Sequence, residues 1–60
     1  MVEWYLVWVD GLHGPEPQKW SAEAFWGRRD RQDIIVRFPL TDREAKLPLD
    51  ALARLHPAPE

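Results

Sequence analysis

The fold is decided near the N-terminus, where the chain reads Val2-Glu3-Trp4-Tyr5-Leu6-Val7-Trp8-Val9. β-branched and aromatic residues dominate this stretch and the turn pair Asp10-Gly11 follows it, so the pattern predicts a β-strand. Successive side chains of a strand point to opposite faces, and here both faces are apolar. They would carry Trp4, Leu6 and Trp8 on one side, and Tyr5, Val7 and Val9 on the other. Such a strand is covered on both sides or leaves one adhesive face, and we expect the adhesive face.

The next segment, residues 10–19, contains two glycines and two prolines. Glycine adopts backbone angles that other residues avoid, and proline lacks the amide donor that a helix or a strand ladder needs. We therefore predict a loop of about ten residues, a length that is often functional in a small domain.

Residues 20–28 are compatible with two structures. Ser21 is a suitable helix N-cap with Glu23 in the first turn, whereas Phe25, Trp26 and Gly27 also fit a strand. We predict a strand that forms a hairpin with the next apolar segment, and a helix stays the alternative. That segment, residues 34–38, reads Ile-Ile-Val-Arg-Phe and has the clearest strand pattern in the chain. The charged residues 28–33 would form the tip of the hairpin.

The C-terminal third predicts a short strand followed by a helical turn. Pro39 is expected to end the preceding strand, and the short apolar run 45–49 predicts a further one. A helical turn capped by Asp50 would then place Leu52 and Leu55 three residues apart on one face.

Sixty residues without cysteine indicate one small domain. A chain this short buries only roughly 60% of the surface that it exposes when unfolded, so a large enclosed active site is not expected. Its 45% hydrophobic, 12% aromatic and 30% charged residues are typical of an ordered globular domain. We expect the domain to cover residues 1–56 and the tail 57–60 to be frayed. The apolar run after Glu3 has no basic leader, which indicates a cytoplasmic protein without a signal peptide or membrane span.

The order of these elements resembles that of small SH3-like β-barrels. The resemblance is closest where a Val-Arg-Phe strand leads to Leu47-Pro48-Leu49-Asp50-Ala51-Leu52-Ala53-Arg54-Leu55. Tudor-type domains, retroviral integrase C-terminal domains and the plasmid-borne type II dihydrofolate reductases are similar there. The resemblance implies an all-β fold, a small SH3-like barrel of four or five antiparallel strands with a C-terminal helical turn. An α+β fold, ferredoxin-like or with residues 20–28 helical, is the alternative.

The resemblance rests on a packing motif without a reacting group, so it implies fold more than function. The reductases have a Val-Gln-Ile-Tyr segment before the matching proline, whereas this chain reads Glu44-Ala45-Lys46-Leu47, and their activity is not carried over. Tudor-type readers cage methylated lysine or arginine with aromatic side chains, for which the tryptophans are the main supply here. We expect a non-catalytic interaction module without a cofactor or a small-molecule substrate.

Four tryptophans are more than so small a core should enclose, so at least one is expected to be exposed. Exposed aromatic side chains anchor peptides, stack on bases or form subunit interfaces. We expect a partner protein or a second copy of the chain to contact Trp4, Trp8, His13, Trp20 and Trp26. Packing in the core is the competing interpretation, and we favour it for Trp20 and Trp26.

Nucleic-acid binding is the alternative function. The net charge of −2 argues against a protein that coats DNA, but residues 19–37 carry five bases against three acids. The bases are Lys19, Arg28, Arg29, Arg31 and Arg37. Asp30 and Asp33 reduce the charge of the same region, so a solvated hairpin tip is the simpler interpretation.

No metal or catalytic site is expected. His13 and His56, with Asp10 or Glu60, have no recognised zinc-ligand spacing. Ser21 is the only serine, and its surroundings do not resemble a nucleophile site. The remaining acids of interest lie in predicted turns, where such side chains bond the local backbone, namely Asp30, Asp33, Asp42 and Glu44.

Overall fold

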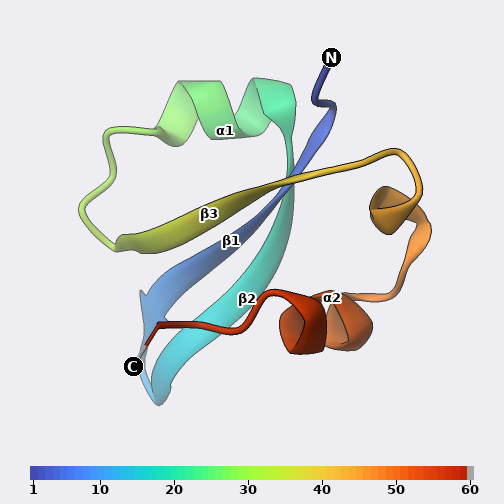
Figure 1. The fold of residues 1–60 in the computed structure, drawn as a ribbon. Helices are drawn as coiled ribbons and strands as arrows, with labels where there is room; N and C mark the ends of the chain where they lie inside the picture. Colours follow the sequence, from blue (N-terminus) through green and yellow to red (C-terminus); the bar gives the residue numbers. More distant parts are fainter. Residues whose placement is uncertain (60) are drawn as a thin grey trace.

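Residues 1–59 fold as a three-stranded antiparallel sheet with one short α-helix on each face. The computed structural model describes residues 1–59 (Figure 1). The elements are β1 (Trp4–Gly11), β2 (Gly14–Ser21), α1 (Ala22–Arg28), β3 (Ile34–Leu40), a 3-10 helix (Glu44–Lys46) and α2 (Leu49–Leu55). The strand order is β2-β1-β3, so β1 is central and the other two strands are edges.

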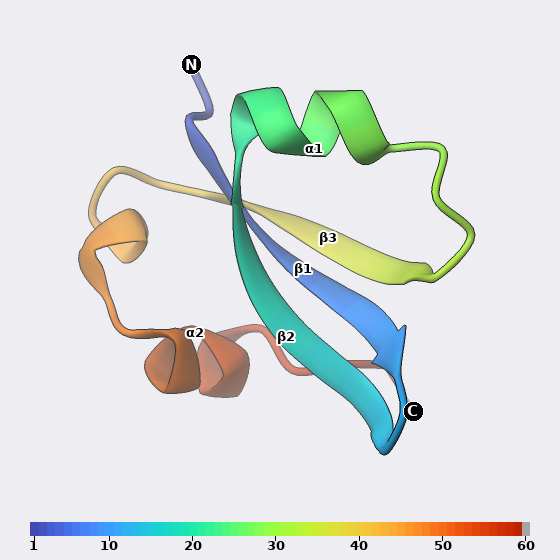
Figure 2. The same ribbon diagram turned by 180° about the vertical axis from the view of Figure 1, so that it is seen from behind.

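β1 separates two small hydrophobic cores. The core under α1 consists of Val7, Val9, Trp20 and Phe25. The core under α2 consists of Leu6, Leu40 and Leu52. Figures 1 and 2 show the two helices on opposite sides of the sheet. The predicted strand is confirmed, but both of its faces are covered over residues 6–9, where one adhesive face was expected.

β2 occupies most of the segment predicted as a loop. The two-residue turn Leu12-His13 joins it to β1. Gly14 follows the turn with a φ of 107°, a left-handed conformation that glycine adopts without strain. Pro15 and Pro17 lie two residues apart in the strand, and an edge strand tolerates proline where its nitrogen faces away from the neighbouring strand. The loop predicted over residues 10–19 is therefore wrong, because both prolines fall on the open side of an edge.

α1 replaces the strand predicted over residues 20–28. The Ser21 hydroxyl accepts a 3.1 Å hydrogen bond from the Ala24 amide and caps the helix. An acidic residue in the first turn and a basic one in the last suit the helix dipole. The helix buries Phe25 and leaves Trp26 exposed. The helical alternative is thus confirmed, and the hairpin with β3 is wrong, because capping and tertiary packing outweigh the strand propensity of the aromatic pair.

β3 pairs antiparallel with β1 and forms the second edge of the sheet. The register sets Tyr5 opposite Pro39 and Val7 opposite Arg37. The strand predicted over residues 34–38 is confirmed. It continues through Pro39, which was expected to end it, because the edge position tolerates a missing amide donor.

The strand predicted over residues 45–49 is also wrong. The amide of Thr41 donates a 3.0 Å hydrogen bond to Oε1 of Glu44, and the Glu44 amide donates a 3.1 Å bond to Oγ1 of Thr41. These two bonds close a turn over residues 41–44, and the 3-10 helix follows it in place of a strand. The predicted helical turn is confirmed as α2, in which Leu52 is fully buried and Leu55 is 56% exposed. Its N-cap is Pro48, and Asp50, which was expected to cap it, lies in the first turn.

Residues 1–59 are β-rich, with three strands where four or five were predicted, and two short helices stand where an all-β fold was expected. β2 and β3 each pair only with β1, so the sheet formed within residues 1–59 has two open edges and does not close into a barrel. No helix in this part of the chain is long and apolar enough to cross a membrane. Residues 57–59 follow α2 without regular secondary structure, and Glu60 lies outside the described residues, so the frayed tail stays a prediction.

Candidate binding groove

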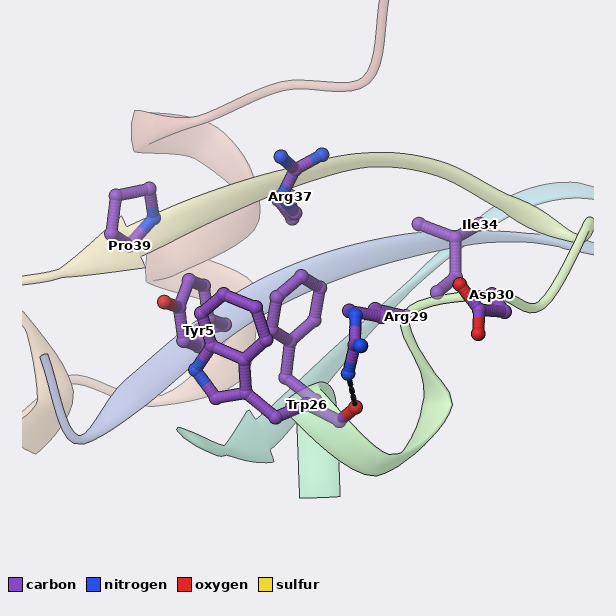
Figure 3. Close-up of a pocket in the computed structure, with 8 residues that line it drawn as sticks. Tyr5, Trp26, Arg29, Asp30, Ile34, Arg37 and Pro39 are labelled. Carbon is purple, nitrogen blue, oxygen red and sulfur yellow. Dashed lines mark hydrogen bonds between the residues drawn. The ribbon is translucent and has the colours of Figure 1, made fainter. Parts of the chain in front are cut away.

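A groove opens between α1 and β3 on the face of the sheet that α1 covers. α1 packs mainly against β1 and β2, so the β3 side of this face stays open. The groove has a volume of about 630 Å³, which falls in the range of ligand-binding pockets. Figure 3 shows its lining, which consists of Tyr5, Phe25, Trp26, Arg29, Asp30, Ile34, Arg37 and Pro39.

Three aromatic rings form one continuous surface in the groove. The rings of Tyr5 and Phe25 stack with their centroids 4.4 Å apart and an interplanar angle of 26°. Phe25 meets Trp26 edge to face at a centroid distance of 5.6 Å. Phe25 is buried in the core, whereas Trp26 is 55% exposed. The buried ring of Phe25 therefore supports an indole that is accessible to solvent.

Two arginines lie against this aromatic surface. Cζ of Arg29 is 5.5 Å from the centroid of the Trp26 ring, and Nη1 of Arg29 donates a 2.7 Å hydrogen bond to the Trp26 carbonyl. Cζ of Arg37 is 5.5 Å from the centroid of the Phe25 ring. Neither arginine forms an ion pair with another described residue. With Asp30 as the acid in the lining, the groove carries one net positive charge.

A second pair of arginines covers Trp20 on the same face of the sheet. The Cζ atoms of Arg28 and Arg31 each lie 5.3 Å from the ring centroid of Trp20. Nε of Arg31 donates a 2.9 Å hydrogen bond to Oδ1 of Asp33, and its Nη2 pairs with the other carboxylate oxygen. These hydrogen bonds hold the pKa of Asp33 below its usual value. Arg31 is therefore neutralised locally.

The residues predicted to bind a partner do not lie together. Trp26 lines the groove, and Trp20 is buried beside it. Trp8 is buried on the α2 face, and Trp4, of the same strand parity, is 37% exposed there. His13 is exposed in the turn between β1 and β2. Core packing is thus confirmed for Trp20 and wrong for Trp26, because the second indole lies in the open groove and is 55% exposed.

The predicted basic set is split between the two faces of the sheet. Lys19 is paired with Leu6 and Arg37 with Val7, so these two basic side chains point in opposite directions. Nζ of Lys19 lies 5.0 Å from the ring centroid of Trp4 on the α2 face. The arginines of the α1 face are Arg28, Arg29, Arg31 and Arg37.

The two histidines do not share a site in the described part of the chain. Nε2 of His56 lies 2.7 Å from Oε2 of Glu44, which gives this ring a local partner. Residues 1–59 contain no group of three or more His, Cys, Asp or Glu side chains placed to hold a metal ion. Glu60, which was considered as a ligand, lies outside these residues, and the hydroxyl of Ser21 serves as the cap of α1.

Sequence reasoning missed the residues that complete the groove, namely Tyr5, Phe25, Ile34 and Pro39. One signal was present, because alternation along β1 sets Tyr5 on the face of Val7 and Val9. The position of α1 over that face was the missing information, since it decides which part of the face is left open.

Comparisons with protein-family models, with curated proteins and with solved structures found no match. Membership in the SH3-like superfamily therefore stays a prediction, although the sheet of residues 1–59 is open, and the groove is the feature from which a function can be inferred.

Proposed function

We propose that the protein is a binding module that holds a segment of a partner protein in the groove between α1 and β3. The proposal rests on Trp26, which is 55% exposed and lies against the buried ring of Phe25. Tryptophan, tyrosine and arginine are the residues that most often dominate the binding energy of protein interfaces. All three types line this one groove.

The groove is also ordered before any partner arrives. Ring stacking fixes Tyr5 and Phe25, and the hydrogen bond from Arg29 to the Trp26 carbonyl ties one guanidinium to α1. Side chains that are already ordered lose less conformational entropy on binding, so more of the contact energy contributes to affinity.

The charges favour a protein over a nucleic acid. A bound strand needs a basic track that follows several phosphates, and affinity then comes from the release of counterions. Here Lys19 lies on the opposite face, Arg31 is paired with Asp33, and Asp30 offsets part of the charge of the groove. The net charge of the chain is −2.

The test is a selection from a random peptide library displayed on phage, with the wild-type protein and the Trp26→Ala variant as parallel baits. We expect peptides that bind the wild type and fail on the variant. A Leu12→Ala variant is the matched control, because Leu12 is exposed at the hairpin turn, away from the groove, and its loss should leave the selected peptides bound.

Three results would overturn the proposal. One is the absence of any peptide whose binding depends on Trp26. Another is binding of fluorescent oligo-dT or oligo-rU that weakens steeply between 0.05 and 0.5 M salt and is lost with Arg29→Gln, since the groove would then bind nucleic acid. The third is a dimer in light scattering that Trp26→Ala converts to a monomer, because a second copy would then occupy the groove.

A further inference from the structure

We propose that the groove selects a partner segment in which a carboxylate side chain lies next to an apolar side chain. The carboxylate would lie between Arg29 and Arg37, and the apolar group would lie on Trp26. This inference rests on the proposed function and names the chemistry of the segment.

The two arginines offer donors that no other described residue uses. A guanidinium carries five N–H donors, and Arg29 spends one of them on the Trp26 carbonyl. Arg37 has no hydrogen-bonded side-chain partner or ion pair within residues 1–59. Figure 3 shows Arg37 on the β3 side of the groove and Arg29 on the α1 side, with the Arg37 guanidinium turned away from Arg29. Arg37 is exposed, so its side chain can turn toward an acceptor that lies between the two arginines.

Aromatic rings support both guanidinium groups. Arg37 lies over Phe25, which is only 4% exposed, and Arg29 lies over Trp26. These contacts leave donors of both guanidinium groups without a partner among the described residues, and a planar fork of donors matches a carboxylate in two parallel hydrogen bonds.

The remaining charge of the groove favours a carboxylate over a phosphate. Asp30 lines the groove with the two arginines, so the net charge available to a ligand is one positive unit. That charge is balanced by one carboxylate and over-compensated by a phosphate monoester, which carries about −1.5 to −2 at pH 7.

The two ends of the groove differ in their side chains. This difference decides which end receives the apolar side chain of the bound segment and which end excludes its carboxylate. In Figure 3, Tyr5 and Trp26 lie toward the Pro39 end, and Asp30 lies with Ile34 at the other end. The register of the sheet agrees, because Tyr5 is opposite Pro39 whereas Ile34 is opposite Val9 farther along β1. The apolar side chain therefore belongs at the Pro39 end, and Asp30 repels a carboxylate from the opposite end.

The test reads the composition of the peptides whose binding depends on Trp26. We expect Asp or Glu next to an aromatic or branched aliphatic residue to be enriched over the unselected library. For a synthetic peptide of that kind, Arg37→Gln should weaken binding by about tenfold, the loss expected for a charge-assisted hydrogen-bonded pair. Asp30→Asn should strengthen binding severalfold, and Arg43→Gln, which changes an exposed arginine outside the groove, should leave it unchanged.

Each contrary outcome has a separate meaning. Peptides that depend on Trp26 but carry no acid, or that bind Arg37→Gln as well as the wild type, overturn the carboxylate assignment and leave the proposed function standing. Tighter binding when phosphoserine replaces the acidic residue overturns the choice of carboxylate over phosphate. Absence of any peptide that depends on Trp26 overturns the proposed function itself. Thermal melting of every variant shows whether a loss of binding is a loss of folding.

Discussion

The indole Nε1 of Trp8 donates a 2.7 Å hydrogen bond to the backbone carbonyl of His56, 48 residues away in the chain. The bond ties the residue that ends α2 to the central strand. The His56 ring stacks on Phe38 at a centroid distance of 4.8 Å, and its Nε2 lies 2.7 Å from Oε2 of Glu44. One residue thus joins the central strand, β3 and the 3-10 helix, and it holds α2 on the face opposite the groove.

The core under α2 should depend strongly on Leu52. This side chain is fully buried with Leu6 and Leu40, so Leu52→Ala removes apolar contacts and leaves a cavity. We expect a loss of about 2–5 kcal/mol in the free energy of unfolding, measured with urea at low temperature. Leu55→Ala is the control, because Leu55 is 56% exposed, and its cost should stay within about 0.5 kcal/mol. Equal costs for the two variants would contradict the packing of α2.

The stability of α1 should depend on the N-cap Ser21. Ser21→Ala removes the acceptor of the bond from the Ala24 amide, and we expect it to cost about 0.5–2 kcal/mol in chemical denaturation. Ser21→Asp keeps an acceptor at the cap and should retain most of the stability. If both substitutions cost the same, the cap would not be what starts α1.

The stability of the C-terminal region should fall in acid through Glu44. The Thr41 amide and then His56 hydrogen-bond its carboxylate, and both lower the pKa of Glu44 from the ordinary 4.5. A lowered folded-state pKa gives stabilisation that is complete above the unfolded value and is lost as the pH falls through the folded one. The difference in melting temperature between wild type and Glu44→Gln should therefore be complete well above pH 4.5 and shrink steadily as the pH falls below that value.

A Thr41→Ala variant separates the contributions to this pH dependence. It removes the hydroxyl acceptor of the Glu44 amide but keeps the backbone N–H that donates to the carboxylate. Its stability should be lower overall, and most of the acid-dependent loss should be preserved, because the Thr41 amide is the largest cause of the lowered pKa of Glu44 and the Thr41 side chain is a smaller one. A difference between wild type and Glu44→Gln that stays constant from pH 6 to pH 2.5 would show that the carboxylate contributes nothing through its charge.

Two glycines should respond in opposite directions to alanine. Gly14 has a φ of 107°, so Gly14→Ala places a side chain in a strained backbone conformation and should cost about 1–2 kcal/mol. Gly27 lies in α1, and a Cβ there would meet nothing within 4 Å. Gly27→Ala should raise stability by about 0.5–1 kcal/mol through higher helix propensity. Thermal melting of both variants checks the sign, and a stabilised Gly14→Ala would contradict the turn geometry.

Local patterns in the sequence were enough to predict β1, β3 and α2. The apolar residues on both faces of β1 and the spacing that places Leu52 on an apolar face are properties of single segments, and both are confirmed. β2 was not predicted, because its prolines were expected to break a strand and the sequence does not show which strand they would pair with. Pro15 and Pro17 disrupt a ladder only where their nitrogens face the neighbouring strand, and pairing alone decides that.

The groove could not be predicted for a related reason. Its lining comes from β1, α1, β3 and the loop after α1, and the sequence does not state how far α1 extends over the sheet. The tryptophans showed that aromatic surface would be exposed, but only the direction of α1 separates the buried Trp20 from the exposed Trp26. The charges were similarly ambiguous until the register set Lys19 and Arg37 on opposite faces.

The prolines of the two edge strands also bear on how the molecule behaves at high concentration. Pro15 and Pro17 on β2 and Pro39 on β3 leave gaps in the rows of outward amide donors that another strand would need for pairing. Copies of the chain are therefore poor templates for an intermolecular sheet, although the fold is short, β-rich and without cysteine. Replacing Pro15 and Pro17 with threonine would restore those donors, and we expect the variant to form fibrils more readily than the wild type.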